Sequence, residues 1–253
     1  MQTLSLWIGV ALLALAGAVA LLAAQGEPPD GGFVTVVLGA AGGLQEDNLT
    51  AYLLAPKGSG DFVSLDAGTL LAGLEVAAAR GSLRDLRRPP DSGMRLPGWA
   101  LRNIRAYLIS HPHLDHVAGL VLNAPDDAAK PILGTAATLD ALRDHVFNWT
   151  LWPNFGNEGE GFLLNKYAYT RLEPGVETAI AGTTMTVEAH TLSHSAPYPS
   201  TAFLVRSGEA YALFFGDTGP DAVEGEGRLA RVWARVAPLA REGTLRGLFL
   251  EVS

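Results

Sequence analysis

The sequence contains no cysteine in its 253 residues, which excludes disulfides, thiolate metal sites and cysteine nucleophiles. Charge is also scarce, because Asp, Glu, Lys and Arg together make up 17% of the chain, against about 25% in typical soluble domains. Basic residues are the minority, and the formal net charge of −8 argues against a protein that holds long nucleic acids on a basic face. Any metal ion must therefore be bound by His, Asp or Glu.

One long apolar run stands at the N-terminus. Residues 4–24 contain no charged residue and precede a Pro- and Gly-rich linker at 27–32. Such a run is typical of a secretory signal peptide, and at ~1.5 Å per residue it is also long enough to span a hydrocarbon core of ~30 Å. We therefore expect residues 1–25 to be a signal peptide or an N-terminal anchor, and residues 26–253 to form one globular domain in the periplasm or outside the cell.

The remaining chain shows two batches of strand patterns, each followed by helical patterns. The predicted strands are β-branched or apolar runs at 33–38, 51–55, 62–68, 106–109, 130–135, 183–190, 201–207, 210–217 and 245–253. The predicted helices have apolar residues at helical spacing, at 69–88, about 99–105, 136–146 and 227–240. This order predicts an α/β fold in which two sheets pack on each other and helices cover the outside.

Residues 110–125, SHPHLDHVAGLVLNAP, hold half of the six histidines of the chain. Side chains two residues apart in an extended segment point the same way, so His111 and His113 should share one side. Asp115 and His116 lie where the chain turns into a helix, and they can reach a second point nearby. Imidazoles and carboxylates suit zinc, manganese or iron, and two-metal sites hold ions about 3.5–4 Å apart. The loop therefore predicts two sets of metal ligands.

Two ions need more ligands than this loop supplies. His194 lies in a Ser- and Pro-rich loop just after the predicted strand 183–190, and Asp217 ends the predicted strand 210–217. A carboxylate at a strand end projects from the sheet edge and can bridge two ions. His190 is the alternative to His194, at the strand end rather than in the loop. His145 is expected at a helix end or in a pocket wall.

The HxHxDH pattern, with a later single His and a later strand-ending Asp, resembles the metallo-β-lactamase superfamily. Within it, HPHLDHVAGLVLNAP is similar to the signature of the class II cyclic nucleotide phosphodiesterases, and LRDHVFNWTLWPNF and STAFLVRSGEAYALFFGDTGPD also resemble that family. The resemblance implies a four-layer αββα metallo-hydrolase domain at 26–253, two divalent metal ions, usually taken as Zn²⁺, and hydrolysis of cyclic AMP or cyclic GMP to the 5′-nucleotide. The donor types also allow Mn²⁺ or Fe²⁺.

The resemblance also implies which residues bind the metals. By position, they are His111, His113 and His194 for one ion, Asp115 and His116 for the other, and Asp217 as the bridge. The last metal-binding histidine of the family lies beyond the strand where this chain ends, and no histidine follows His194. We therefore expect a domain truncated at its C-terminus, with the second ion one ligand short.

Other residues have two interpretations each. We expect Asp115 to orient the nucleophile as well as to bind metal. Asp66, in LDAG, is either a hydrogen-bond partner of a ligating histidine or a turn residue at a strand end. Asn48 either contacts substrate or shapes its glycine-rich loop. Four aromatic residues either stack a purine or pack in the core: Phe147, Trp149, Trp152 and Phe155.

Two alternative functions stay open from the sequence. One is another hydrolase of the same fold, either a tRNase Z-like phosphodiesterase or a thioesterase or lactamase, although an acidic chain with an export leader fits tRNA poorly. The other is a non-catalytic nucleotide-binding protein. The expected partner is a small cyclic nucleotide rather than a nucleic acid polymer, with membrane contact only through an uncleaved N-terminal segment.

Overall fold

The computed structural model describes residues 31–250, with the exception of 44, 85, 87 and 196. The chain divides into two units, residues 1–30 and 31–253, and the fold belongs to the second. The expected signal peptide or anchor at 1–25 lies outside the described residues. Among the helices of the described part, none has the length and apolar character needed to cross a membrane.

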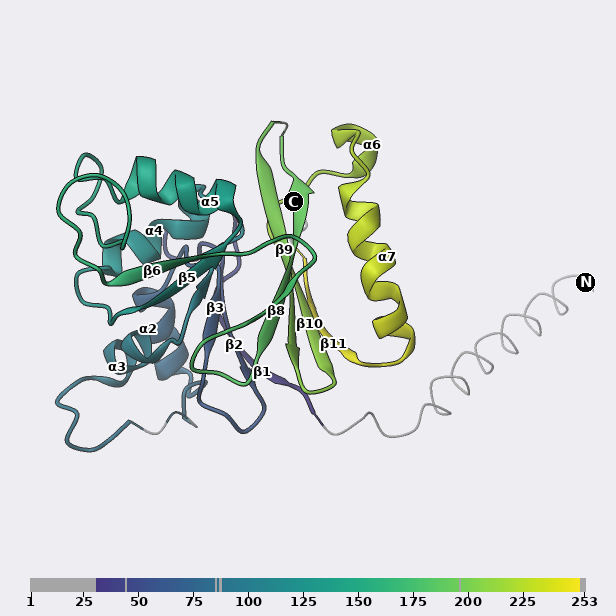
Figure 1. Cartoon of the computed structure of the whole chain (residues 1–253). Helices are drawn as coiled ribbons and strands as arrows, with labels where there is room; N and C mark the ends of the chain where they lie inside the picture. The colour runs from purple at the N-terminus through teal and green to yellow at the C-terminus, as the bar shows by residue number, and fades with distance from the viewer. Residues whose placement is uncertain (1–30, 44, 85, 87, 196, 251–253) are drawn as a thin grey trace, which may run out of the picture. The chain divides into compact units, whose positions relative to one another are not determined.

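Two sheets form the centre of the second unit (Figure 1). The first has the order β1 to β6, with strands β1 (Phe33–Gly39), β2 (Ala51–Pro56), β3 (Val63–Leu65), β4 (Tyr107–Leu108), β5 (Lys130–Gly134) and β6 (Tyr167–Arg171). The second has the order β11-β10-β9-β8-β7, with strands β7 (Glu177–Ala179), β8 (Thr186–Ser193), β9 (Pro199–Ser207), β10 (Ala210–Phe215) and β11 (Leu245–Phe249). Strands β3 to β6 are parallel, so their C-terminal ends lie at one edge of the first sheet.

Helices cover the outer faces of both sheets (Figure 1). The first sheet carries α2 (Leu71–Ala79), α3 (Leu96–Asn103), α4 (Leu114–Asn123) and α5 (Ala136–Ala141), which continues as the π-helix η1 (Leu142–Val146). The second sheet carries α7 (Arg228–Arg241), preceded by the short α6 (Asp221–Glu224). The layers therefore follow the order helix, sheet, sheet, helix, and the αββα sandwich expected from the sequence is confirmed.

Strands buried on both faces explain the continuous apolar runs in the sequence. In β2, Leu53 packs with the helices of the first layer, whereas Leu54 packs between the sheets. In β10, Phe214 packs between the sheets and Phe215 packs with α7. Since successive side chains of a strand point to opposite faces, each such strand contributes to two cores at once.

Several predicted boundaries are wrong. The helix predicted over 69–88 ends at Ala79, because Gly81 takes a left-handed φ of +75° and its amide donates to the Ala78 carbonyl, as at a helix C-terminus closed by glycine. The predicted strand 183–190 lies three residues later in the structure, as β8. The strand expected to end at Asp217 ends at Phe215, so the aspartate lies in the loop that follows.

The N-terminal ends of the parallel strands meet at a buried polar network. Tyr107 and Tyr167, the first residues of β4 and β6, both donate their hydroxyls to Asp127 Oδ2, at 2.7 and 2.9 Å. Lys130, the first residue of β5, donates to Asp127 Oδ1 at 2.6 Å and to the Leu101 carbonyl at 2.8 Å. All four side chains of this network are buried and hydrogen-bonded, as buried polar groups require.

Candidate metal centre

The opposite edge of the sandwich gathers the chemistry-bearing residues. Asp66 directly follows β3, the histidine loop follows β4, and His194 directly follows β8. Within the histidine loop, His113 is the extended residue before α4, with φ −64° and ψ 149°, so the chain changes direction there. Residues far apart in the sequence therefore come together because their strands end at the same edge.

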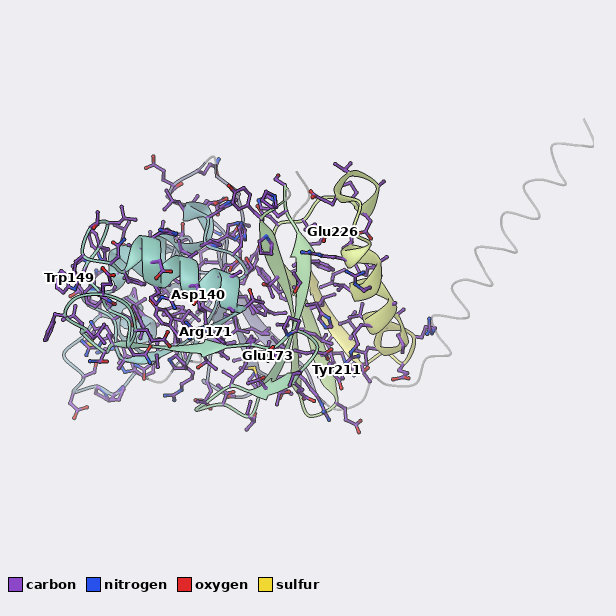
Figure 2. All side chains as sticks on the ribbon, turned by 45° about the horizontal axis from the view of Figure 1, so that its top comes forward. Asp140, Trp149, Arg171, Glu173, Tyr211 and Glu226 are labelled. Carbon is purple, nitrogen blue, oxygen red and sulfur yellow. The ribbon has the colours of Figure 1, made fainter. Side chains whose placement is uncertain are left out.

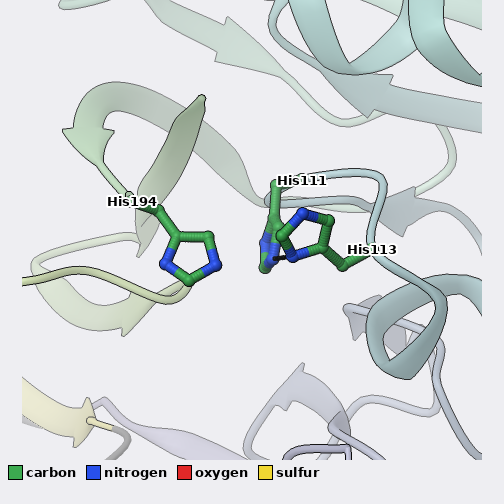
Figure 3. Close-up of side chains that lie close together, drawn as sticks. All are labelled: His111, His113 and His194. Atoms are coloured by element: carbon green, nitrogen blue, oxygen red, sulfur yellow. Dashed lines mark hydrogen bonds between the residues drawn. The ribbon is translucent and has the colours of Figure 1, made fainter. Parts of the chain in front are cut away.

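Three histidines form a first group of metal-binding side chains. One nitrogen from each of His111, His113 and His194 lies within 4.8 Å of the others. His111 Nε2 and His113 Nδ1 are 3.1 Å apart, and Figure 3 shows all three imidazoles facing one another. His111 and His113 come from the first sheet and His194 comes from the second. The group therefore joins the two halves of the sandwich.

A second group shares a member with the first. His111, His116 and Asp217 again have one donor atom each within 4.8 Å of one another. Asp217 Oδ1 lies 3.2 Å from His116 Nε2, while Oδ2 lies 3.8 Å from His194 Nε2 and 4.0 Å from His111 Nε2. The carboxylate of Asp217 thus reaches both groups, which is the position of a bridging ligand.

Asp115 lies at the margin of the second group. Its Oδ2 is 3.6 Å from His116 Nε2 and its side chain is 21% exposed, whereas the His116 side chain is buried. A Cβ placed at Gly43 would lie 3.9 Å from the same Asp115 oxygen, so the glycine-rich loop passes beside it. Asp115 is therefore near the cluster, with part of its carboxylate open to solvent.

Asp66 and Ser110 orient two of these histidines. Asp66 Oδ1 accepts from the Ser110 amide, and Oδ2 accepts from the Ser110 hydroxyl, both at 2.7 Å. Since that hydroxyl has a single hydrogen, its 3.0 Å contact with His111 Nδ1 makes Nδ1 the donor. Asp66 Oδ2 also lies 2.7 Å from His116 Nδ1. In both histidines Nδ1 therefore carries a proton, and Nε2 faces the cluster.

The surroundings of these two histidines shift their pKa values in opposite directions. Burial, followed by the charge of His116, lowers the pKa of His111 to about 2. Burial also lowers the pKa of His116, but the carboxylates of Asp66 and Asp217 outweigh it and raise that pKa to about 10. His111 is accordingly neutral with a lone pair for a cation, and a metal would displace the Nε2 proton of His116 on binding.

These residues fit a divalent cation. The donors are imidazole nitrogens and carboxylate oxygens, they converge from both sheets, and Asp66 fixes the orientation of two imidazoles in the way that carboxylates support metal-bound histidines. The structure thus brings together five of the six residues expected as ligands within two overlapping groups, and it places the sixth, Asp115, beside them.

The other candidate residues lie elsewhere or serve the fold. His190 lies inside β8, with its Nε2 3.2 Å from Glu188 Oε1 rather than in the cluster. His145 lies in η1 and lines a pocket beside His111 and His113. Asn48 Oδ1 accepts from the Ala40 amide at 3.1 Å, so its side chain shapes the glycine-rich loop.

The four aromatic residues considered for stacking a purine differ in their burial. Phe147 and Phe155 are buried in the core, and Trp152 packs against it. Phe147 and Phe155 therefore present no open face to a purine, and the core interpretation holds for them and for the partly buried Trp152. Trp149 is 49% exposed and points outward from its loop (Figure 2).

Comparison with known proteins places the chain in a family. Residues 30–253 match the family of class II cAMP phosphodiesterases. The chain is 47% identical over 225 residues to the 3′,5′-cyclic-nucleotide phosphodiesterase of Aliivibrio fischeri, which covers 88% of this chain and 68% of the relative. It is 37% identical over 222 residues to a protein of Yersinia pestis named "Probable 3′,5′-cyclic-nucleotide phosphodiesterase", with 87% and 64% covered.

The chain belongs to the class II cAMP phosphodiesterases. The family resemblance read from the histidine loop is thereby confirmed. This class II phosphodiesterase chain spans about two thirds of the length of the two relatives, 68% and 64%. Unliganded yeast PDE1 has the same fold, with a TM-score of 0.74, 24% identity, and 85% of this chain and 74% of that chain covered.

The family's sequence pattern does not by itself give every residue of the site. Ser110 was missed, although it directly precedes His111 and couples it to Asp66. A serine between a short buried strand and the first ligating histidine is the signal that would have found it. Tyr198, which lines a pocket beside the cluster, was missed too, because its proximity to the histidine loop depends on how the two sheets meet.

Proposed function

We propose that this class II phosphodiesterase hydrolyses 3′,5′-cyclic nucleotides to 5′-nucleotides, using two divalent metal ions. One ion would be held by His111, His113 and His194, and the other by His116 with Asp115. The observation that carries the proposal is the place of Asp217, whose two oxygens lie within 4.0 Å of Nε2 of His111, His116 and His194. A carboxylate shared between two donor groups is the hallmark of a two-metal hydrolytic site.

The side chains around the site would have different roles in the reaction. Divalent ions bound there would lower the pKa of a water molecule and place positive charge beside the phosphodiester. Asp66 holds His116 in orientation, and Asp217 keeps the two donor groups at a fixed spacing. Asp115, with part of its carboxylate open to solvent beside His116, is placed to accept a hydrogen bond from the attacking water and so to aim it at phosphorus.

Two finer points belong to the same proposal. Zinc is the metal we propose, since the first donor group consists of three imidazoles, which suit zinc, while Mn²⁺ and Fe²⁺ are the alternatives. We also propose export, because the apolar run at 4–24 resembles a signal peptide. The substrate is then a small molecule met in the periplasm or outside the cell.

The test compares substrates and two histidine variants of the whole chain. Hydrolysis of cyclic AMP, cyclic GMP and a generic aryl phosphodiester is measured with and without a chelator, together with bound metal. His194→Ala should lose cyclic nucleotide turnover by about 100-fold or more, since metal ligands and their partners commonly contribute that much. His190→Gln, a histidine of β8 outside the cluster, is the matched control and should keep it. Turnover of the aryl ester alone, or turnover that survives the chelator, would contradict the proposal.

A further inference from the structure

Two pockets lie on either side of the histidine cluster. One, of about 330 Å³, is walled by His111 and His113 on one side and by His145 and Tyr198 on others. The other, of about 310 Å³, is walled by His194, Asp217, Thr218 and Glu224. In a 3′,5′-cyclic nucleotide the phosphodiester is fused to the ribose, so the base lies one sugar ring away from phosphorus. The base must therefore lie in a pocket whose wall includes metal ligands, and both pockets meet this condition.

One face of α5 and η1 makes the first pocket hollow. Ala137, Ala141 and His145 follow one another at intervals of four residues and all line the pocket, as residues on one helical face do. The two alanines are small and leave space, and His145 is the third residue of this face in the pocket wall. His145 belongs to the π-helix η1, a form that recurs at functional sites.

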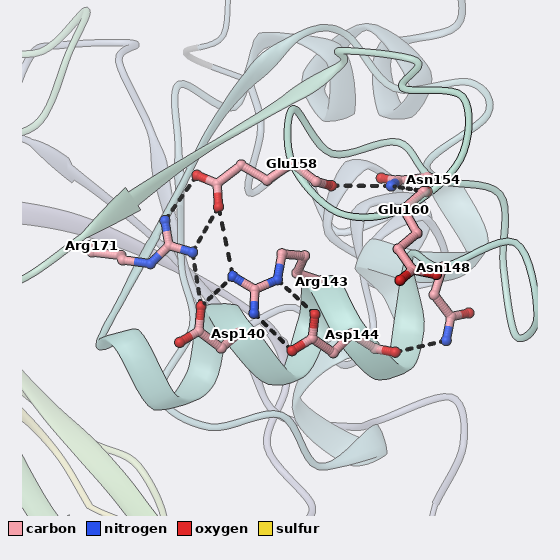
Figure 4. Close-up of polar contacts among 8 residues, drawn as sticks. All are labelled: Asp140, Arg143, Asp144, Asn148, Asn154, Glu158, Glu160 and Arg171. Atoms are coloured by element: carbon pink, nitrogen blue, oxygen red, sulfur yellow. Dashed lines mark hydrogen bonds and ion pairs between the residues drawn. The ribbon is translucent and has the colours of Figure 1, made fainter.

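A charged network holds the helix from its other side (Figure 4). Arg143 of η1 donates to Asp140 at 2.9 Å and to Asp144 at 2.6 Å. Arg171 of β6 donates to the same Asp140 oxygen and to Glu158, both at 2.8 Å. These contacts anchor α5 and η1 to β6 and to the loop before it, so the wall that carries His145 is fixed before any ligand arrives.

Tyr198 lines the same pocket from the loop between β8 and β9. The residue is 64% exposed, and its carbonyl accepts from the His194 amide at 3.1 Å. That hydrogen bond closes the loop between β8 and β9, so the position of Tyr198 is tied to that of a cluster histidine. An exposed aromatic ring beside a metal centre is a surface on which a flat heteroaromatic base can stack.

The structure assigns the pocket between His145 and Tyr198 to the nucleoside of the cyclic nucleotide: the base stacks on Tyr198, His145 is in reach of its polar edge, and the phosphodiester lies toward His111 and His113. The assignment rests on the proposed function. The second pocket suits a base less, because the carboxylates of Asp217 and Glu224 face it without an aromatic partner. The hollow beside Trp149 and Phe162 has no cluster histidine in its wall, so a base there would leave the phosphorus out of reach.

The assignment predicts that variants of this pocket affect two substrates differently, although both contain the same cyclic phosphodiester. Cyclic AMP and ribose 3′,5′-cyclic phosphate, which lacks the base, are compared by kcat/KM. Tyr198→Ala and Ala137→Trp, which fills the hollow, should lower the value for cyclic AMP by about 5- to 150-fold, the range for loss of stacking on one base. They should leave the base-free substrate unchanged. Tyr198→Phe should restore most of the loss, and Phe162→Ala, an exposed aromatic outside the pocket, should have no effect.

A binding measurement removes the dependence on turnover. Binding of 5′-AMP to the chelator-treated chain, measured by calorimetry, should weaken in Tyr198→Ala and His145→Ala and stay unchanged in Phe162→Ala. Equal losses on both substrates, or none on either, would overturn the assignment, and so would unchanged 5′-AMP binding. If the unaltered chain hydrolyses neither substrate, the proposed function fails instead, and 5′-AMP binding alone then decides the assignment.

Discussion

Asp66 is a single residue on which two histidines of the centre depend. It is fully buried, and it holds a left-handed φ of +52°, which is unusual for a residue other than glycine. Such backbone strain persists only where the surroundings fix it, and here its carboxylate is bound by Ser110 and His116. The strained turn therefore serves to aim the carboxylate at the back of the metal centre.

Replacing this carboxylate by an amide tests that role. Asp66→Asn keeps the shape and tolerates a left-handed backbone. Its amide nitrogen cannot accept a hydrogen bond, however, so Ser110 or His116 loses its charged acceptor. We expect metal affinity, measured by competition with a chromophoric chelator, to fall about 10- to 100-fold. Asp61→Asn, a surface aspartate that pairs with Arg105, is the control and should bind metal as the unaltered chain does. Equal affinities in the two variants would show that Asp66 serves only the turn.

The sequence predicts the histidine cluster but not the hydrogen bonds that orient its histidines. His111, His113 and His116 could be predicted because extended and helical geometry act over a few residues, and one loop contains all three. Asp66 contacts Ser110, the neighbour of His111, across 44 residues of sequence and His116 across 50. The pairing of β3 with β4 brings these segments together. The sequence left Asp66 with two interpretations for this reason, and the structure shows that it fills both at once.

At the scale of elements, α4 is fastened directly to the loop after β3. The Ala67 amide donates to the His116 carbonyl at 2.8 Å, and the Gly119 amide donates to the Gly68 carbonyl at 2.7 Å. This close approach requires glycine at position 68, where a Cβ would lie 2.0 Å from the Asp115 carbonyl oxygen. The helix that carries Asp115 and His116 thus sits on the turn that carries Asp66.

A methyl group at this contact should separate the two elements. We expect Gly68→Ala to lower the free energy of unfolding by about 1–3 kcal/mol or more, because backbone atoms must move to admit the added atom. Metal affinity should fall with it as α4 shifts from Asp66. Gly60→Ala is the matched control: its Cβ would meet nothing closer than Leu86 Cδ2 at 3.7 Å, so its stability should stay within about 0.5 kcal/mol of the unaltered chain. Urea unfolding of both variants measures the free energy of unfolding. A similar loss in both would contradict a specific role of the close contact at Gly68.

Element types were more predictable than element ends. Apolar runs identified strands such as β2, β9 and β10 because those strands are buried on both faces. The helix predicted over 69–88 ended early because Gly81 closes it, and a glycine eight residues before a proline pair is easily interpreted as part of a helix interior. The pattern that predicted a helix over 136–146 did not distinguish the π-helix η1 from a regular α-helix, since single π-turns inside helices are rare.

For the molecule as a whole, the two edges of the parallel strands have opposite roles. The C-terminal edge gathers histidines and partly open carboxylates, while the N-terminal edge is closed by Asp127, Lys130, Tyr107 and Tyr167, all buried. Burial first, and then the charge of Asp127, raises the pKa of both tyrosines above the ordinary range. Burial lowers the pKa of Lys130, although Asp127 opposes that shift. One edge is thus built for chemistry and the other for stability.

This closed edge predicts how stability responds to alkali. Both tyrosines keep their protons in the folded chain at pH values where the unfolded chain loses them. Their contribution to the free energy of unfolding is therefore complete below pH ~10. Above that pH it is lost by about 1.4 kcal/mol per pH unit for each tyrosine. Lys130 acts in the opposite direction, but only up to the ordinary lysine pKa of ~10.4. Above that pH, Tyr167→Phe should unfold with a slope against pH that is shallower by one proton, whereas the exposed Tyr198→Phe should keep the original slope. Urea unfolding at a series of alkaline pH values measures both, and identical slopes for the two variants would mean that Tyr167 ionises freely in the folded chain.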